Sequence, residues 1–594
     1  MERDISKLLV YSSLLLGCLT TTVFALLSFA SIETFRYVLN ESLGQRYAAA
    51  YTPQFHETLT SRLLLAMCVS AIGTSVVAWL RGSIEHWLSR VLSAWRHAGR
   101  ELATDMRVGL QAVGCGWVTV CVLTLAAVAL RLLFLFDPIE WDEATTFIRF
   151  ASRPLWFLIS WYAEPNNHVF HSSLVHFSTL AFGSEPWAVR LPAFIAGVLV
   201  VPATYVLGAL AHDRHTALIG GALAVVSPLL INNSASARGY SMLCLFALLL
   251  AIAVVYAIQR DNRLAWFSAA VFSALGFYTI PTMIYAVAVV LVWAAALCLP
   301  GKPELIPPRL LLRRSLEFVS GAMALATVLY LPILVISGPK AILANRWVQP
   351  LTWPELADLF AYRASVLWTH WHANTPTGLK AMLVIGAAVG VMRAYSSWRQ
   401  LPVLCGAVVL APILLLQRVA PYPRVFVFLL PFYLLASASG IAWSVKWLGR
   451  SRDPVLIRVI ILVAILLSGT IAYNVIKSHD LLENPRLEDV YADMREVAEF
   501  LRQELRPGDK LYTAGNDPLA YYLLTYKLQG HVEADLFTAT RVLVFVHRYE
   551  DVQTVIEKER LRPSDFSEPR LLYRSRLSQK VFELLPATSS PSSP

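Results

Sequence analysis

Residues 108–143 read VGLQAVGCGWVTVCVLTLAAVALRLLFLFDPIEWDE, an apolar run that ends in a cluster of acids. The apolar part exceeds the roughly 20 residues that a helix needs to cross a bilayer. Carboxylates follow at once, in Asp137, Glu140, Asp142 and Glu143. The sequence therefore predicts a transmembrane helix that delivers an acidic cluster to one membrane surface.

The composition of the whole chain points to the same environment. Of its 594 residues, 56% are hydrophobic and 15% are charged, whereas a soluble domain has about 25% charged residues. This balance excludes a soluble globular enzyme. The net charge of +10 comes from basic residues scattered between apolar runs, without the continuous basic stripe of a nucleic-acid-binding protein. The 7 cysteines form no CxxC pair, so we expect no disulfide framework and no zinc site.

Apolar windows predict an α-helical polytopic membrane protein with about thirteen spans. The first window is kept as a span because it is longer than the apolar core of a signal peptide, about 7–15 residues. The break at Pro281 is compatible with a kink or with a turn between two spans. The windows are 8–30, 62–80, 108–136, 186–210, 216–233, 241–258, 264–280, 282–300, 315–337, 378–394, 402–418, 424–446 and 456–476.

Positive charge sets the predicted orientation, because short loops rich in Lys and Arg stay in the cytoplasm. All the basic loops fall on one side of the membrane if the chain reverses at Pro281, which favours a turn there. The N-terminus is then cytoplasmic. Three water-facing pieces lie on the outer side: 31–61, 137–185 and the region from 477.

The C-terminal region reads as a small α/β domain. Apolar residues recur at helical spacing over 490–505, a strand begins at Lys510, and RVLVFVH at 541–547 is typical of a buried strand. We divide the chain into an N-terminal extension with two spans (1–107), a transmembrane core (108–476), this domain (477–586) and a disordered tail (587–594).

Chemistry is expected in the outer juxtamembrane loop, 137–185. A transporter places ionisable groups inside its spans, but these spans are almost free of acids. A carboxylate at the bilayer surface can act as a general base toward an acceptor that arrives from water. The alternative is structural: Asp142 and Glu143 cap an amphipathic helix that runs from 144 to about 162.

Several motifs in order carry a resemblance to a known family. They are the acidic pair Asp142-Glu143, the turn Glu164-Pro165-Asn166-Asn167-His168, the segment FGSEPWAVRLP at 182–192, Ser236-Ala237-Arg238-Gly239-Tyr240, and Pro423-Arg424 before Pro431. Together they resemble membrane glycosyltransferases of the glycosyltransferase C superfamily, in particular the protein O-mannosyltransferase and lipid A aminoarabinose transferase group, bacterial family 39-like. The resemblance covers about 108–476, with outer juxtamembrane helices and a C-terminal outer domain.

The resemblance implies an inverting hexosyl- or pentosyltransferase that takes a sugar from a polyprenyl phosphate. It implies Asp142 as the catalytic base and Glu143 as its helper, which orients an acceptor or a loop or only caps a helix. Arg238, Tyr240 and Arg424 would bind the donor phosphate, and Glu164, Asn167 and His168 the substrate. We interpret Arg190 as an anchor at the membrane interface and leave His171 and His176 as structural. No metal or other cofactor is expected to be required, although a divalent cation is possible.

This sequence departs from the family pattern in three places. The interfacial helix more often begins with His-Pro-Pro or Lys-Pro-Pro, where this chain has Asn166-Asn167-His168. Val425 stands where Tyr is usual, and two extra spans precede residue 108. The first two departures leave the identity of the sugar donor open, and the third suggests an added partner or a regulatory role.

The predicted setting is the inner (plasma) membrane of a bacterium, with a lipid, glycan or protein acceptor outside the cytoplasm. Nucleic acid is not expected as a partner. Two alternatives stay open: a transporter or flippase of lipid-linked sugars, and a non-catalytic assembly scaffold. A transporter would tolerate the change Asp142→Asn, whereas a transferase that uses this base would not.

Overall fold

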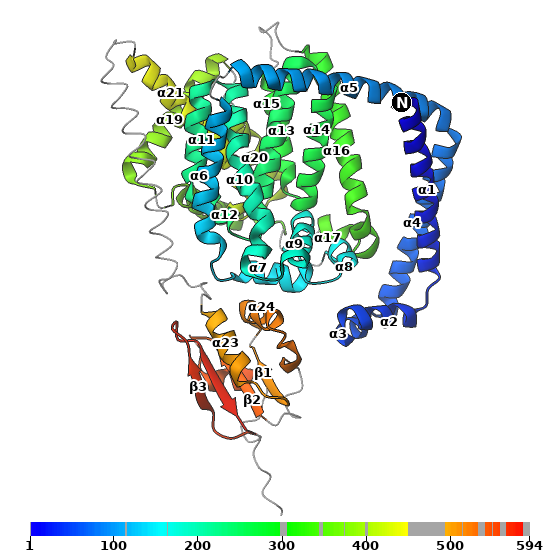
Figure 1. Ribbon diagram of the computed structural model, residues 1–594, viewed down its shortest axis with the longest axis vertical. Coiled ribbons are helices and arrows are strands. Elements are labelled where there is room, and N and C mark those ends of the chain that lie inside the picture. The colour runs from blue at the N-terminus through cyan, green and yellow to red at the C-terminus, as the bar shows by residue number, and fades with distance from the viewer. Residues whose placement is uncertain are drawn as a thin grey trace, which may run out of the picture.

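Long apolar helices run side by side through the centre of the computed structural model, and a smaller C-terminal region lies below one end of them (Figure 1). The structure describes residues 2–585 except 113–115, 163, 298–305, 344–348, 374, 398–401, 450–492, 514, 533–540, 549 and 559–565. The bundle consists of α6 (Gly116–Leu135), α10 (Pro186–Ala211), α11 (Arg214–Val226), α12 (Pro228–Ser234), α13 (Tyr240–Arg260), α14 (Arg263–Thr279), α15 (Met283–Leu297), α16 (Pro308–Ile336), α19 (Thr377–Ser397), α20 (Pro402–Gln417), η2 (Pro423–Leu429) and α21 (Leu430–Gly449).

Among the described residues, 7 helices are long and apolar enough to cross a membrane, or up to 8 if the bent pair α11 and α12 is one span. Every predicted window up to 424–446 coincides with a described helix or helix pair. Several of these helices, such as α15, are shorter than a full span. The window 456–476, the domain boundary at 476 and the tail 587–594 lie outside the described residues. The total of about thirteen spans therefore stays a prediction.

The chain reverses at Pro281. Asp261, just before α14, pairs with Arg314 near the start of α16, and the Tyr330 hydroxyl near the end of α16 donates to the Phe277 carbonyl near the end of α14. Helices α14 and α16 thus run in the same direction. The helix between them, α15, returns across the bundle, which confirms the predicted turn.

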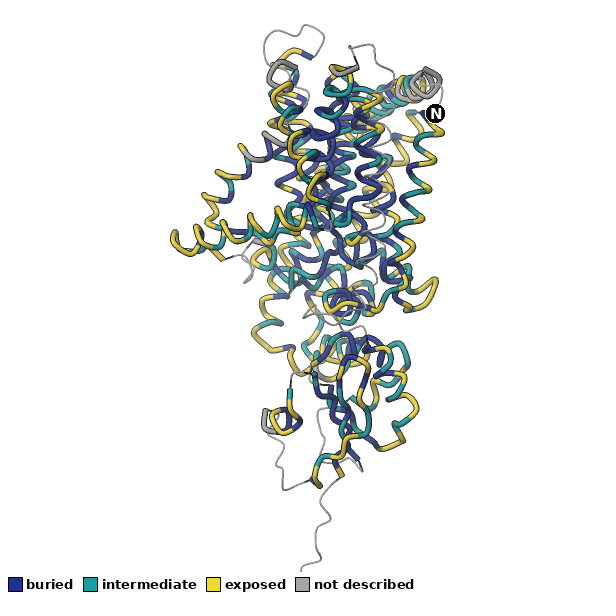
Figure 2. The backbone as a smooth tube through the Cα atoms, turned by 90° about the vertical axis from the view of Figure 1, so that its left-hand side faces the viewer, coloured by how far each residue is buried: buried dark blue, intermediate teal, exposed yellow. Residues whose placement is uncertain are grey.

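A separate helical pair precedes the bundle. Helices α1 (Glu2–Ser28) and α4 (Pro53–Trp79) pack against each other, are joined by α2 (Ile32–Leu43) and α3 (Gln45–Ala50), and are only 6% buried over their apolar windows. Figure 2 shows the contrast between this exposed N-terminal part and the buried centre of the bundle. Such apolar exposure is what a lipid-facing helix requires.

The basic stretch after α4 was predicted to be a loop, but in the structure it forms the helix α5 (Arg81–Ala112). It lies across the end of the bundle away from the C-terminal region (Figure 1). Trp95 packs on Phe267, the Asn262 amide donates to the Ala98 carbonyl at 3.1 Å, and Arg96 pairs with Glu2 at 2.9 Å. Apolar residues at helical spacing among the basic ones explain why the segment forms an amphipathic surface helix.

A break between α11 and α12 precedes the turn that carries Arg238. Pro228 begins α12, and the two helices are bent by 59°. The buried Arg131 of α6 donates to the freed carbonyls of Ala224 and Val225 and, at 3.0 Å, to the Ser234 hydroxyl. This capping of an interrupted helix in the bundle interior holds the segment 235–239 at the membrane surface.

The C-terminal region contains a four-stranded sheet of order β1-β2-β4-β3. Strand β2 is buried along its whole length, pairs parallel to β1 and antiparallel to β4, and corresponds to the strand predicted at 541–547. The elements are α23 (Met494–Glu504), β1 (Asp509–Tyr512), α24 (Asp517–Thr525), η3 (Gln529–His531), β2 (Arg541–Val546), α25 (Val552–Lys558), β3 (Arg570–Arg574) and β4 (Lys580–Leu584). Helix α24 faces the bundle (Figure 1).

The remaining helices cover the end of the bundle that faces this sheet, which we call the site face. They are α7 (Trp141–Thr146), η1 (Phe147–Ala151), α8 (Leu155–Ser160), α9 (Val169–Phe182), α17 (Lys340–Leu343) and α18 (Trp353–Trp371). The predicted single helix from 144 to about 162 is wrong. A π turn, in which the Ser152 N–H donates to the Phe147 carbonyl, and Pro154 divide it into three short pieces.

Candidate active site

Helix α7 begins directly at the acidic cluster. Glu140 is the N-cap, and its backbone N–H donates to the Glu143 carboxylate at 2.9 Å, which completes a capping box. Asp142 lies between these two residues in the chain, and its carboxylate contacts Arg238 and Arg424 instead of the helix N-terminus. The structural alternative from the sequence is therefore correct for Glu143, while Asp142 is left for other contacts.

Asp142 lies between two arginines that come from distant parts of the chain. Its Oδ2 atom is 2.5 Å from Nη1 of Arg238, in the turn before α13, and 2.8 Å from Nη1 of Arg424, at the start of η2. The Asp142 side chain is 38% exposed, whereas Arg238 is 5% exposed. The fold thus brings together the predicted base and both predicted phosphate-binding arginines.

The two guanidinium groups control the ionisation of Asp142. Burial opposes its ionisation, but the charges of Arg238 and Arg424 outweigh that effect, aided by a hydrogen bond from Asn166, so the pKa of Asp142 lies below its ordinary value. The negative form is therefore the resting form at neutral pH. The sequence motif contained Asn166 but gave no sign of this contact.

Aromatic rings hold the arginines in place. The guanidinium carbons of Arg238 and Arg424 lie 5.6 and 6.0 Å from the centre of the Tyr240 ring. Arg424 also lies 5.2 Å from the ring centre of Tyr422, which no sequence argument singled out. Cation–π contacts of this kind favour a fixed guanidinium plane. Tyr240, predicted to bind phosphate, is placed next to both cations.

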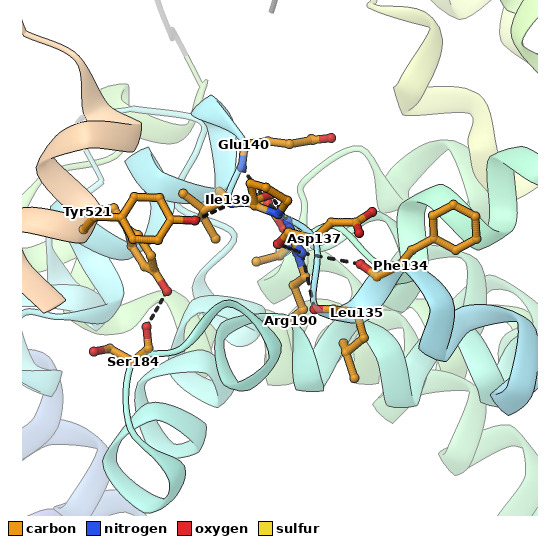
Figure 3. A network of polar contacts seen from close by, with 12 residues as sticks. Phe134, Leu135, Asp137, Ile139, Glu140, Ser184, Arg190 and Tyr521 are labelled. Carbon is orange, nitrogen blue, oxygen red and sulfur yellow. Dashed lines mark hydrogen bonds and ion pairs between the residues drawn. The ribbon is translucent and has the colours of Figure 1, made fainter. Parts of the chain in front are cut away.

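Glu143 belongs to a buried hydrogen-bonded network, and this network corrects the interpretation of Arg190. Arg190 is not an interfacial anchor: it is buried and grips the Glu143 carboxylate with Nε at 2.8 Å and Nη2 at 2.6 Å. The same guanidinium donates to the carbonyls of Asp137 and Pro138 (Figure 3). Glu143 is fully buried and also accepts the Ala237 N–H at 2.5 Å. These contacts tie Glu143 to the turn before α7, to Arg190 and to the Arg238 turn, whereas its predicted role as a helper in the reaction stays a prediction.

One of the clustered acids, Glu140, has a perturbed pKa, as the sequence predicted. The residue is exposed, but protein atoms close to its carboxyl group and, second to them, the negative charge of Glu143 raise its pKa above the ordinary value.

The three predicted substrate-binding residues divide between the open site and its support. Glu164 pairs with Arg149 at 2.8 Å near the surface. The Asn167 amide is buried and donates to the carbonyls of Leu158 and Trp161, so it supports the loop. His168 is buried and accepts the Gly239 N–H at 2.9 Å, so it supports the turn that carries Arg238.

The two histidines left as structural differ from each other. His176 contacts the Ala151 carbonyl at 2.8 Å, which agrees with a structural role. Both ring nitrogens of His171 are buried without a hydrogen-bond partner. Among the described residues, no group of three or more His, Cys, Asp or Glu side chains could hold a metal ion. The prediction that no metal is required stays a prediction.

An apolar pocket of about 370 Å³ is lined in part by η2, the element that carries Arg424. Helix α18, helix α20 and η2 line it, with Phe360, Leu410 and Phe426 among the lining side chains and Arg363 as its one charged lining residue in the described part of the chain. The Arg363 guanidinium lies 4.2 Å from the ring centre of Tyr422, whose ring also contacts Arg424. The Tyr422 ring therefore connects a side chain that lines the pocket with one arginine of the Asp142 cluster.

Comparison with known proteins agrees with this architecture. Residues 169–336 match the family model of dolichyl-phosphate-mannose-protein mannosyltransferases. The structure is similar to ArnT from Cupriavidus metallidurans in the apo state, with TM-score 0.52 and 12% identity over 79% of this chain and 98% of that one. It is similar to the same protein bound to undecaprenyl phosphate, with TM-score 0.51, 12% identity and the same coverage. No curated protein matches the sequence.

These findings confirm the resemblance that the motifs indicated. The chain is a multi-pass membrane protein with the fold of the glycosyltransferase C superfamily. The sequence match lies in the part that carries α9, α10, the Arg238 turn and α13.

Proposed function

We propose that this protein transfers a sugar from a polyprenyl-phosphate donor to a lipid, glycan or protein acceptor at the site face. The observation that carries the proposal is the arrangement around Asp142, one partly exposed carboxylate with two arginines at 2.5 and 2.8 Å, and it is joined by an apolar pocket lined in part by η2, the element that carries Arg424. A lipid phosphate needs cations at the membrane surface and an apolar path for its chain, and this site offers both.

The proposed reaction is a single displacement. Asp142 accepts the proton of the acceptor hydroxyl or amine, and the acceptor atom forms a bond to the anomeric carbon of the sugar. The bond from that carbon to the phosphate oxygen breaks on the opposite side, so the anomeric configuration inverts. The electron pair leaves with the polyprenyl phosphate, and Arg238 and Arg424 stabilise the charge that develops on its oxygens.

The undecaprenyl phosphate in one ArnT structure supports a lipid-phosphate donor. The site supplies its own cations, so the proposal needs no metal ion for phosphate binding. It places the protein in a bacterial inner membrane with the site face outward, in keeping with the positive-inside rule. The sugar, a hexose or a pentose, is left to experiment.

Mass spectrometry of membrane lipids and surface glycans tests the proposal directly. Cells that carry the Asp142→Asn variant should lose a sugar from one glycan or lipid, while a polyprenyl-phosphate sugar accumulates. Donor and acceptor would then be identified together. Unchanged lipids and glycans, with the variant present in the membrane at wild-type level, would reject transfer. Movement of a lipid-linked sugar across vesicles that survives Asp142→Asn would favour a transporter instead.

A further inference from the structure

The C-terminal region shares a hydrophobic cluster with the site loop. Leu519 and Tyr521 of α24 are buried in the same cluster as Ile139, Phe147 and Ala237, which surround α7 and the Arg238 turn. The rings of Phe147 and Tyr521 meet edge to face at 5.3 Å. Because a continuous core transmits displacement between its members, α24 cannot move without moving the surroundings of α7.

Two hydrogen bonds attach α24 to the chain on both sides of Asp142. The Ile139 N–H donates to the Tyr522 hydroxyl at 3.2 Å, and the Thr145 hydroxyl donates to the Asp517 carboxylate at 2.6 Å. Ile139 and Thr145 lie three residues before and three residues after Asp142. The segment that carries the carboxylate is therefore held at both ends by a single helix.

A third connection reaches the turn that contacts Asp142 from the other side. Arg149 lies in the π turn η1, and its two terminal nitrogens contact Glu164 at 2.8 Å and Asp517 at 3.1 Å. Glu164 begins the turn that contains Asn166, a hydrogen-bond partner of Asp142. A π turn inside a short helix redirects side chains and is frequent at functional sites. Here it aims Arg149 between the loop and α24.

We propose that α24 is a positioning element of the active site, in which Asp517 and Tyr522 hold Asp142 in line with its acceptor. The proposal rests on the function proposed above and assigns a role to the C-terminal region in that reaction. Neither residue touches the arginines that would bind the donor phosphate. Loss of these contacts should therefore slow transfer without weakening the binding of a lipid phosphate.

The variant Tyr522→Phe removes one hydroxyl and keeps the ring. Tyr526→Phe is the matched control, because its hydroxyl contacts the exposed side chains of α23, Glu499 at 3.4 Å and Arg495, and not the site loop. In the purified full-length protein, deuterium exchange in peptides that cover 137–151 should be about five-fold faster in Tyr522→Phe, as expected for one lost buried hydrogen bond. The control should exchange like the wild type.

The variant Asp517→Asn weakens the contacts to Thr145 and Arg149 together. Its control is Glu499→Gln, which changes the same charge on the surface of α23. In cell membranes, Asp517→Asn should lower the rate of sugar transfer about ten-fold, since two charge-assisted contacts are affected. The dissociation constant for undecaprenyl phosphate should stay within two-fold of the wild type in both variants.

The combined results separate a positioning role from a general loss of structure. Transfer and exchange equal to those of the controls would overturn the proposal, as would a parallel loss of undecaprenyl phosphate binding, which indicates general disruption. If the wild type neither transfers a sugar nor binds undecaprenyl phosphate, the proposed function fails. The exchange comparison still decides whether α24 holds 137–151 in place.

Discussion

Asp142 and Glu143 are neighbours on α7, yet they lie in opposite surroundings. Glu143 is fully buried, and Arg190, the Ala237 N–H and the Glu140 N–H satisfy its oxygens. Asp142 is 38% exposed and shares one oxygen with two arginines, one of which is 46% exposed. Two identical charges in consecutive positions therefore have different roles.

The two clusters differ in how completely their charges and hydrogen-bonding atoms are paired. The Glu143 network balances one anion with one cation and leaves no room for a ligand. The Asp142 cluster holds two cations and one anion, and Nε of the buried Arg238 has no hydrogen-bond partner. A buried, incompletely paired cation favours a second anion. The sealed network fixes the loop, and the open cluster is free to bind and react.

The largest expected effect is on the rate of sugar transfer when Asp142 is replaced. Asp142→Asn should reduce sugar transfer by about 10³-fold, the range of general-base catalysis, and lower the unfolding temperature of the purified protein much less than Glu143→Gln does. Transfer assays on membranes and thermal unfolding followed by fluorescence measure both quantities. Turnover within a few-fold of the wild type would remove Asp142 from the role of base.

Glu143→Gln should act through stability. Removing one partner of a buried ion pair leaves the other charge uncompensated, at about 3–5 kcal/mol. We expect a lower unfolding temperature, with transfer lost in proportion to folded protein. The double variant Glu143→Met with Arg190→Met is the control, and it should recover part of the stability. Equal destabilisation by Asp142→Asn would show that the Asp142 cluster, like the Glu143 network, acts mainly in holding the fold.

In Asp142→Asn, the binding of a lipid phosphate should become tighter while sugar transfer becomes slower. The Asp142 carboxylate occupies the arginines that a phosphate would use, so Asp142→Asn should tighten the binding of undecaprenyl phosphate about ten-fold, a gain of one freed charge contact. Arg424→Lys should weaken it by a similar factor, because Lys cannot fork onto phosphate oxygens. Unchanged affinity in Asp142→Asn would show that the phosphate binds elsewhere.

The smallest effect is a pH shift. The pKa of Asp142 is lowered by Arg238 and Arg424 against the effect of burial. Its stabilising contribution is therefore present above the ordinary aspartate pKa and is lost as pH falls through the lower, folded-state value. Arg424→Met should raise the pKa of Asp142 and move the acid limb of the transfer–pH profile to higher pH. An acid limb that stays in place would mean that another group controls it.

Much of the architecture was visible in the sequence because hydrophobic length and charge act locally. The apolar windows up to 424–446 coincide with helices, and the reversal at Pro281 followed from the positions of Lys and Arg. The buried strand β2 followed from its unbroken apolar run. Helix α5 was missed because its many arginines resembled a basic loop, although its apolar residues follow a helical period.

The site was predictable in part because the motifs that resemble the family stand in the expected order along the chain. Motif order identified Asp142, Arg238 and Arg424, which the fold brings together although Arg424 lies 282 positions after Asp142 in the chain. The roles of Arg190, His168 and Asn167 were not predictable, because burial and partners decide them. An arginine at a span end looks the same in sequence whether it reaches lipid headgroups or a buried glutamate.

By itself the sequence determined that this chain spans a membrane many times, where its long apolar helices lie, and which acids and arginines follow their ends. Those properties depend on local hydrophobicity and charge, which each segment carries with it. Only the tertiary structure decided that Asp142 is open and Glu143 sealed, and that α24 reaches the site loop. These outcomes depend on contacts between residues far apart in the chain, and no local pattern encodes which distant partner a side chain will meet.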